Sequence, residues 1–381
     1  MAGIYTHIPF CKQRCTYCDF HFSTSFEVYR EAVIKAISQE LILRKNEISE
    51  KIQTIYFGGG TPSLLLKSEI ELIINTVKDN FILGQNVEIT LEANPEDISI
   101  ENLILWKEQG INRLSIGLQS FKESDLTWMN RSHNVAEGIK SVKLAQSYGF
   151  KNISVDIMYG LPNLSSKEWK EHLQSVLALN VTHISAYCLT IEPKTALFQE
   201  VKKKKILPAN DEVQSTQFEE MIEFLAINGY EQYEISNFAR DEQYSKHNSN
   251  YWKGVPFLGI GPSAHSFDGT HRRWNISNNT KYYKNVGLNE SWYEEELLSK
   301  EDQWNELFLT GLRTKWGVSK EKISLLGGFS EEEENCINNY ILGGEILETA
   351  TVFLLTKKGL LFADAIAENL FRLNESKSLL L

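Results

Sequence analysis

Short apolar runs alternate with longer amphipathic stretches along the first two thirds of the chain. The apolar runs have the length and composition of buried β-strands and occur at residues 4–8, 54–57, 87–91, 113–117, 153–158, 183–189 and 232–235. Between most of them, apolar positions recur at helical spacing, at residues 26–48, 69–80, 100–109, 135–148, 166–179 and 211–228. Repeated strand–helix units of this kind predict an α/β fold, an incomplete barrel built on a parallel sheet.

Glycine and polar residues stand at or near the carboxyl ends of several predicted strands. In βα architectures the binding site forms where the strands end, so we expect these residues to converge on one rim. The glycine run at residues 58–60 lets the backbone approach a ligand closely. It is not a phosphate-binding P-loop, because no Gly-Lys-Ser/Thr follows it, and a tight turn would explain the run equally well. For Asp156, the alternative to a role in binding is a purely structural hydrogen bond. The residues concerned are Gly58, Gly59, Gly60, Thr61, Glu92, Gln119 and Asp156.

Three cysteines near the start of the chain carry the most specific chemistry. Cys11, Cys15 and Cys18 form a Cys-x3-Cys-x2-Cys pattern. Three thiolates can hold three corners of an iron–sulfur cube and leave the fourth iron open to another ligand. The alternatives are three reduced thiols in a loop, or a structural zinc site completed by His7 or His21, although the chain has no second cysteine pair. The odd total of five cysteines argues against a disulfide framework.

The cysteine spacing resembles the signature of the radical S-adenosylmethionine (SAM) superfamily. The lead-in Tyr-Thr-His-Ile-Pro-Phe at residues 5–10 is similar to that of the oxygen-independent coproporphyrinogen oxidases and their relatives. The resemblance implies an incomplete (β/α)6-type barrel that carries a [4Fe-4S] cluster on Cys11, Cys15 and Cys18. It also implies that the amine and carboxylate of SAM chelate the open iron, and that reduction of the cluster cleaves SAM.

Further matches to the superfamily's motifs imply a set of SAM contacts. Gly59, Gly60 and Thr61 match the stretch that meets the methionyl amine, and Tyr5 matches an aromatic residue beside the bound cofactor. Carboxylates suit ribose hydroxyls, and a forked guanidinium suits a carboxylate, so the set is chemically coherent. The positions that match contacts to the ribose, the carboxylate or neighbouring polar atoms are Glu92, Gln119, Arg131 and Asp156.

The pattern changes after residue 235. Residues 236–290 are rich in asparagine, glycine, aromatic residues and histidine, and they predict a loop-rich cap over the barrel mouth. Within this segment His247 stands near Tyr251 and Trp252, a set that could ligate haem iron and pack on a porphyrin face. Composition alone favours a loop histidine beside two buried aromatic residues, and His265 and His271 are alternative ligands.

The His-Asn-x-x-Tyr-Trp stretch at residues 247–252 resembles the motif of the HemW-type haem chaperones, a branch of the same superfamily. The resemblance implies haem as a further cofactor and haem-accepting proteins as partners, with respiratory proteins among the candidates, and it allows a homodimer. Two features differ from true coproporphyrinogen oxidases. No cysteine lies two positions after Cys18, and their long N-terminal extension is not found before the cysteine loop. Both differences argue against porphyrinogen decarboxylation.

The C-terminal part, residues 291–381, has a different pattern from the barrel at 1–235. Helix-compatible segments at 301–313 and 320–326, followed by segments at 346–355 and 360–373, predict a helical or winged-helix-like domain. The family resemblance implies that this domain is of the HemN type. Acidic residues outnumber basic ones in this part, and the net charge of the chain is −11. Phosphate attraction is therefore not favoured, and we expect no nucleic-acid partner.

Size and composition suit an enzyme-like body, since 381 residues with 42% hydrophobic residues can bury sizeable cores. No apolar stretch is long enough to span a bilayer, and no signal-peptide core precedes the cysteine loop, so the expected compartment is the cytoplasm. Three hypotheses follow. The chain is a haem chaperone with a SAM-ligated cluster, a radical enzyme acting on a tetrapyrrole such as coproporphyrinogen III, or a zinc-stabilised binding protein.

Overall fold

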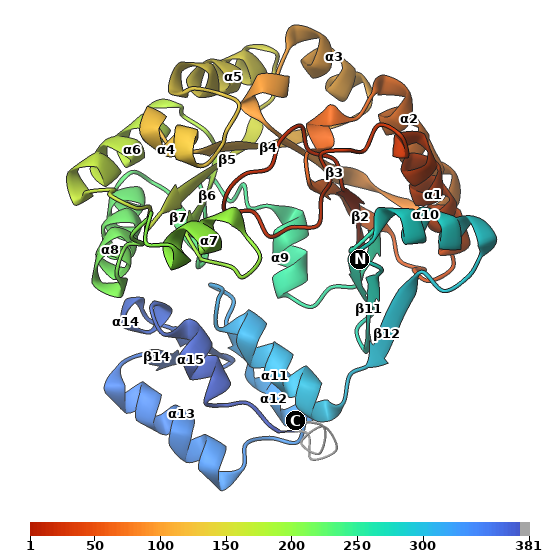
Figure 1. The fold of residues 1–381 in the computed structure, drawn as a ribbon. Coiled ribbons are helices and arrows are strands. Elements are labelled where there is room, and N and C mark those ends of the chain that lie inside the picture. The colour runs from red at the N-terminus through yellow and green to blue at the C-terminus, as the bar shows by residue number, and fades with distance from the viewer. Residues whose placement is uncertain (374–381) are drawn as a thin grey trace.

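A parallel sheet of strand–helix units forms the larger part of the structure, a computed structural model in which residues 1–373 are described. Neighbouring strands of this part are parallel. Figure 1 shows them as an arc with helices on its outer side. The predicted α/β fold with an incomplete barrel is confirmed. The strands follow chain order: β1 (Ala2–Ile8), β2 (Ile52–Gly59), β3 (Leu83–Ala93), β4 (Arg113–Gln119), β5 (Asn152–Tyr159) and β6 (His183–Cys188).

Helices connect these strands and bury their apolar sides against the sheet. In α6, for example, Trp169, Leu173 and Val176 recur at helical spacing and are all buried. Short 3-10 turns, η1 (Pro62–Leu64) and η2 (Pro95–Asp97), follow β2 and β3. The helices are α1 (Arg30–Leu43), α2 (Lys67–Asn80), α3 (Ile100–Glu108), α4 (Glu123–Trp128), α5 (Val135–Ser147), α6 (Ser166–Ala178), α7 (Ala196–Lys202) and α8 (Asp211–Ile227).

The sheet continues at both of its edges. At one edge β6 pairs with β8 (Asn237–Ala239), which pairs with β7 (Glu231–Glu234). At the other, β9 (Phe257–Ile260) runs parallel to β1 and is followed by antiparallel β10 (His265–Phe267), β11 (His271–Asn275) and β12 (Tyr293–Leu297). Among the described residues β7 and β12 do not pair with each other, so the barrel is open. Helix α9 (Lys246–Trp252) packs against β1 and β2 and lies at this opening (Figure 1).

Residues 236–290 differ from the predicted loop-rich cap. The segment contains β8 to β11, α9 and α10 (Asn279–Leu288). Its strands are three to five residues long, too short for an alternation of apolar and polar positions to reveal them. The segment is mainly an extension of the barrel sheet.

A smaller unit with its own hydrophobic core follows β12. The core includes Trp304, Phe308 and Phe353. Because β12 still pairs with β11, the main sheet extends past residue 291 to Leu297. The winged-helix-like description of this unit stays a prediction. Its elements are α11 (Lys300–Gly311), β13 (Val318–Ser319), α12 (Lys320–Leu325), α13 (Glu331–Gly343), β14 (Ile346–Glu348), β15 (Val352–Leu355), α14 (Lys357–Leu360) and α15 (Ala363–Glu368), with the strand order β13-β15-β14.

Among residues 1–373, none of the helices has both the length and the apolar composition that crossing a bilayer requires.

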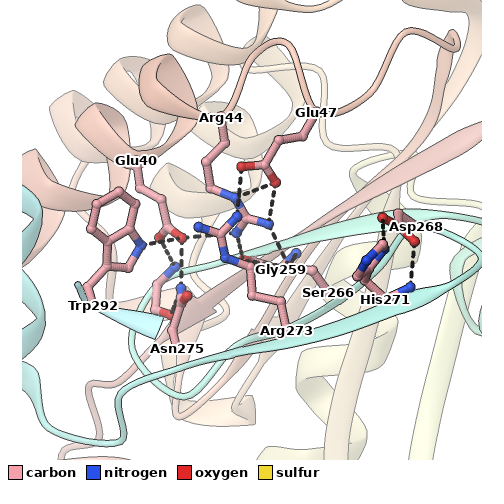
Figure 2. A network of polar contacts seen from close by, with 11 residues as sticks. Glu40, Arg44, Glu47, Gly259, Ser266, Asp268, His271, Arg273, Asn275 and Trp292 are labelled. Carbon is pink, nitrogen blue, oxygen red and sulfur yellow. Dashed lines mark hydrogen bonds and ion pairs between the residues drawn. The ribbon is translucent and has the colours of Figure 1, made fainter. Parts of the chain in front are cut away.

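A buried carboxylate ties α1 to the segments that extend the sheet (Figure 2). Glu40 is fully buried, as is nearly all of Arg44 one turn later. Arg44 also donates to the carbonyl of Gly259 at 2.8 Å and to Oγ of Ser266 at 3.0 Å. A buried charge is costly unless it is paired, so this network fixes the extension to the barrel. The donors to Glu40 are Arg44 Nη1 (3.0 Å), Asn275 Nδ2 (2.8 Å), Trp292 Nε1 (3.1 Å), Tyr282 Oη (2.6 Å) and the Gly261 N–H (2.9 Å).

We expect Glu40→Gln to destabilise the protein by roughly 2–4 kcal/mol, because Arg44 would lose one of its two carboxylate partners while staying buried. Urea unfolding monitored by circular dichroism measures the change. Glu31→Gln, on the same helix but exposed, is the matched control and should shift the midpoint far less, because it removes only the surface ion pair with Lys35. Equal midpoints for the two variants would contradict a stabilising role for the network.

Candidate functional site

The loop that carries the cysteines follows β1 and is held by hydrogen bonds to distant segments. The N–H of Thr16 donates to the carbonyl of Met129 at 3.1 Å, and Nδ2 of Asn130 donates to the carbonyl of Arg14 at 2.8 Å. The N–H of Leu197 donates to the carbonyl of Thr16 at 2.8 Å. Figure 1 shows the loop passing across the inside of the arc of strands. The loop is therefore fixed between the segment after β4 and the start of α7.

A cavity of about 620 Å³ lies beside this loop. Its volume falls within the range of small-molecule sites, about 300–1,000 Å³. The predicted cluster ligands and most of the predicted SAM contacts share it, because the carboxyl ends of neighbouring strands meet at this rim. Those that line it are Cys11, Cys15, Cys18, Gly59, Gly60, Thr61, Glu92, Gln119, Arg131 and Asp156.

The glycines after β2 are required by the close approach of the segment that leads into the cysteine loop. Gly59 has a φ of 105°, and a Cβ on it would lie 2.6 Å from the ring of His7. A Cβ on Gly60 would lie 2.7 Å from the carbonyl oxygen of Phe10. Thr61 follows at once, and its Oγ1 donates to Sγ of Cys11 at 3.4 Å. The run therefore brings the end of β2 against the first cysteine.

Arg131 lies beside a second cysteine. Its Nη1 donates to Sγ of Cys15 at 3.5 Å, and its Nη2 donates to Asn94 Oδ1 at 2.8 Å and to the carbonyl of Gly117 at 2.9 Å. Nε of Arg131 is buried and has no hydrogen-bond partner. The guanidinium thus places a positive charge next to a sulfur and keeps one donor unused, as a site for an anionic ligand group would.

Gln119 ends β4 in a conformation that is uncommon for a residue with a side chain. Its φ is 67°. Its amide nitrogen would lie 2.7 Å from a Cβ on Gly117, so Gly117 makes room for this side chain at the cavity. Backbone strain of this kind costs about 1–3 kcal/mol and occurs most often at functional sites.

Two buried carboxyl groups face the same cavity. Tyr56 Oη donates to Glu92 Oε1 at 2.8 Å, and Ser115 Oγ donates to Asp156 Oδ1 at 3.1 Å. Burial, and to a smaller extent the charge of Asp156, raise the pKa of Glu92 to about 7. Burial also raises the pKa of Asp156. Both groups therefore keep a proton to higher pH than exposed carboxyls, which suits them to hydrogen bonding with neutral hydroxyls.

The thiols of the loop fit a cluster that takes one sulfur per iron. Burial raises the pKa of Cys11 to about 11 and that of Cys18 to about 12, so both must release protons when they bind metal. In the described part of the chain, no three His, Cys, Asp or Glu side chains form a group that could hold a metal ion. In a four-iron cluster each thiolate binds a different iron, and three cysteines spread around one cavity, with Arg131 beside Cys15, match that arrangement.

Tyr5, predicted to lie beside the cofactor, does not line the cavity. Its hydroxyl hydrogen-bonds with Nδ1 of His7 at 3.2 Å, and its ring stacks with that of Tyr56 at 6.0 Å between centroids. Its neighbour Tyr56 links it to the cavity, because the Tyr56 hydroxyl donates to Glu92.

His247 points from α9 into the barrel. Its Nδ1 hydrogen-bonds with Thr54 Oγ1 at 2.9 Å, and its ring lies 5.0 Å from that of Tyr56 and 6.3 Å from that of Tyr5. The N-terminus of α9 is held by Glu88, which accepts hydrogen bonds from the Lys246 N–H at 2.9 Å and the His247 N–H at 3.3 Å. Burial lowers the pKa of His247 to about 3, so its imidazole is neutral at physiological pH.

Tyr251 and Trp252 lie apart from the His247 ring. Both line a different cavity, of about 440 Å³, that His247 does not reach. Phe257 contacts both sides: its ring lies 5.8 Å from that of Tyr251 and 6.4 Å from that of His247. The structure therefore does not gather the three motif residues around one space.

The two alternative histidines are exposed. The ring of His265 stacks with that of Trp274 at 6.5 Å, and His271 Nδ1 lies 3.0 Å from a carboxylate oxygen of Asp268. Neither lines the cavity beside the cysteines or the one at Tyr251.

Sequence reasoning missed three residues at the cysteine cavity. Asn94 contacts Arg131, Tyr17 lines the wall between the cysteines, and Ser115 contacts Asp156. A signal for Asn94 was present, because in a strand it shares a face with Glu92, two residues earlier. Tyr17 sits inside the cysteine motif and gave no separate signal.

Comparison with known proteins places this geometry in a family. A family model described as "Radical SAM superfamily" matches residues 5–176. The chain is 35% identical over 336 residues to "Heme chaperone HemW" of Bacillus subtilis, covering 85% of this chain and 86% of that protein. It is 35% identical over 377 residues to the protein of the same description in Haemophilus influenzae, covering 96% of this chain and 97% of that protein.

A solved structure agrees with the fold along nearly the whole chain. It is described as "Coproporphyrinogen III oxidase (HemN) from Escherichia coli is a Radical SAM enzyme" and has a TM-score of 0.84 at 22% sequence identity. The alignment covers 97% of this chain and 90% of that one. At this level of identity the likeness concerns the fold alone. Fold, cysteine site and relatives together define the class: the chain belongs to the radical SAM superfamily and, within it, to the HemW family.

We expect Glu92→Gln to stabilise the metal-free protein at neutral pH relative to the native chain. Glu92 titrates near 7 in the fold against an ordinary value of 4.5, so between these values the folded state holds a proton that the unfolded state has released. Its contribution to stability therefore falls as pH rises through this range.

Gln does not titrate, so the variant should gain about 1–3 kcal/mol on the native chain between pH 4.5 and pH 7.5. Urea unfolding across this range measures the gain, with exposed Glu101→Gln as control. A stability difference that stays constant with pH would show that Glu92 is not perturbed.

Proposed function

We propose that the chain is a haem chaperone, which binds haem and passes it to acceptor proteins, and that it carries a [4Fe-4S] cluster with SAM at the open iron. One observation supports the cluster and SAM part above all others. Three cysteines, a guanidinium and two carboxyls from four different strands or loops share one cavity. The haem part is supported by relatives described as "Heme chaperone HemW" at 35% identity.

In this proposal Cys11, Cys15 and Cys18 hold three irons, and when bound the cluster supplies an electron that can cleave SAM. Arg131 donates to the Cys15 sulfur, and its positive charge offsets part of the negative charge of the thiolates. Its remaining Nε donor suits the carboxylate of SAM. Gly59, Gly60 and Thr61 would meet the methionyl amine.

The two carboxyls take the sugar. Glu92 and Asp156 face the cavity and accept hydrogen bonds from Tyr56 and Ser115. Because a carboxyl group has more lone pairs than these bonds use, each can also accept a hydrogen bond from a ribose hydroxyl. Because both groups are buried, water competes weakly for those hydroxyls.

For haem, His247 offers a neutral imidazole. Its Nδ1 is engaged by Thr54, which leaves Nε2 as the nitrogen available to iron. Haem-accepting proteins as partners, respiratory ones among them, a homodimer and the cytoplasm as the compartment belong to the same proposal and rest on the family resemblance.

Replacing a single loop cysteine should abolish cluster assembly. After anaerobic reconstitution with iron and sulfide we expect about four irons and four sulfides per native chain, and a near-complete loss in Cys15→Ala. Cys336→Ala, which removes a thiol from α13 in the smaller unit, is the matched control and should keep the native iron content. Zinc without sulfide in the native protein would contradict the proposal.

Haem titration tests the histidine. His247→Ala should lose the Soret shift that haem produces with the native protein, whereas His271→Ala should keep it. Because burial holds the pKa of His247 at about 3, lowering the pH from 8 to 5.5 should leave haem affinity nearly unchanged. An exposed histidine ligand with a pKa near 6.5 would lose about tenfold over the same range. A tenfold loss, or an unchanged Soret shift in His247→Ala, would exclude His247 as the ligand.

A further inference from the structure

The surface beside the cysteine loop is basic, although the net charge of the chain is −11. Residues 202–205 are four consecutive lysines at the end of α7, and Lys194 precedes the same helix. All five lysines are exposed, and within the part of the chain that the structure describes none of them forms an ion pair. The acidic residues of this stretch, Glu192 and Glu200, are only partly exposed. The positive charge therefore faces solvent without a partner.

This surface is joined directly to the residues around Cys15. Nη2 of Arg14, which is also exposed, donates to the carbonyl of Lys194 at 3.0 Å. The N–H of Leu197, in the first turn of α7, donates to the carbonyl of Thr16 at 2.8 Å. Helix α7 is seven residues long, so the lysines at its end lie about 10 Å from this contact. Figure 1 shows α7 beside the cysteine loop. Arg14, Lys194 and residues 202–205 are together called the α7 basic patch.

Two lysines of the patch occupy backbone positions that favour glycine. Lys194 has a φ of 72° and Lys204 a φ of 57°. The N–H of Lys204 donates to the carbonyl of Val201, and that of Lys205 to the carbonyl of Glu200, both at 2.9 Å. This is the bonding of a helix end whose left-handed residue is usually glycine. Backbone strain of this kind is most often kept where it serves a function, which here is to present charge in a fixed geometry.

An electron for a cluster on the cysteine loop has to come from another molecule. Apart from the three loop cysteines the chain has only Cys188, on β6, and Cys336, on α13 of the smaller unit. Two thiols so placed cannot hold a second cluster that would relay electrons from a distant surface. The reductant therefore has to approach the cysteine loop itself, and the α7 basic patch is the charged surface bonded to that loop.

We propose that the α7 basic patch docks an acidic one-electron carrier protein, which passes one electron to the cluster. The inference rests on the proposed function, because it needs the cluster on Cys11, Cys15 and Cys18. The carrier loses one electron, the [4Fe-4S] cluster goes from its 2+ to its 1+ state, and no bond is made or broken. Electron-transfer encounters bury small interfaces and depend on complementary charge to guide the partner. Clustered lysines and an arginine supply that guidance for an acidic protein.

The rate of cluster reduction tests the proposal. The reconstituted full-length protein is mixed anaerobically with reduced flavodoxin, an acidic protein that carries FMN, or with dithionite, a small reductant that needs no docking surface. Loss of the visible absorbance of the cluster gives the rate, at ionic strengths of about 0.01 M and about 0.15 M, where charges are screened beyond about 30 Å and about 8 Å.

Three variants of the chain separate charge at the patch from charge elsewhere. The first replaces three lysines of the patch by glutamine, and the second replaces the same three by arginine, which keeps the charge. The control replaces three exposed lysines on and beside α5, on the outer side of the barrel. The glutamine variant is Lys203→Gln/Lys204→Gln/Lys205→Gln, and the control is Lys140→Gln/Lys143→Gln/Lys151→Gln.

The glutamine variant should react with flavodoxin about tenfold more slowly than the native protein at low ionic strength, and most of the salt dependence should disappear. The arginine variant and the control should react as the native protein does. Dithionite should reduce the cluster of all four proteins at one rate, because it does not use the patch.

A native rate with flavodoxin in the glutamine variant, or equal slowing in the control, would overturn the inference. So would a native cluster that dithionite reduces and flavodoxin does not, which leaves the proposed function intact. A native protein without a reducible cluster would show that the proposed function itself has failed. Binding to vesicles of phosphatidylcholine and phosphatidylglycerol is measured in parallel. If the glutamine variant loses vesicle binding but keeps the native reduction rate, the patch binds a membrane and the inference is wrong.

Discussion

The cysteine loop can lie across the barrel only because the end of β2 has no side chains in its way. A Cβ on Gly59 would lie 2.6 Å from the ring of His7, and one on Gly60 would lie 2.7 Å from the carbonyl oxygen of Phe10. Both distances are shorter than any carbon atom can tolerate. The contact sets the position of Cys11, three residues after Ile8 ends β1. Through the loop's bonds to residues 129 and 130 it also sets the position of Arg131 beside Cys15.

The barrel interior connects this loop with the helix that carries the His-Asn-x-x-Tyr-Trp motif. The ring of Tyr56 lies 5.0 Å from that of His247, and its hydroxyl donates to Glu92. The wall that faces the proposed SAM site therefore also supports the proposed haem ligand. Residues of α9 four positions apart nevertheless serve different spaces, because His247 is turned toward β1 and β2 while Tyr251 lines the cavity at the smaller unit.

Much of the barrel follows from local sequence pattern, and the site follows from topology. Each parallel strand is an apolar run bounded by helical spacing, so periodicity located it, and the rule that βα sites form at strand ends gathered Glu92, Gln119 and Asp156 correctly at one cavity. Short strands such as β10 carry too few residues for a pattern, and the extension was predicted as loops. Long-range bonds gave no signal at all: the Glu40 network joins residues more than 200 positions apart.

The placement of individual side chains was harder to predict than the convergence of strand-end residues on one rim of the barrel. Tyr5 and His247 both face the barrel interior. The direction of each side chain depends on the register of β1 and on how α9 enters the barrel, and no spacing rule describes either. The separation of His247 from Trp252 has the same origin, because helical geometry turns residues five positions apart to different sides.

Mössbauer spectroscopy of the reconstituted cluster, recorded before and after addition of SAM, tests the central claim most directly. The account predicts that SAM changes the signal of one iron in four, the iron without a cysteine, and leaves the other three in their thiolate environment. A cluster whose irons all keep the same signal in the presence of saturating SAM, or a protein that assembles no cluster, would contradict it.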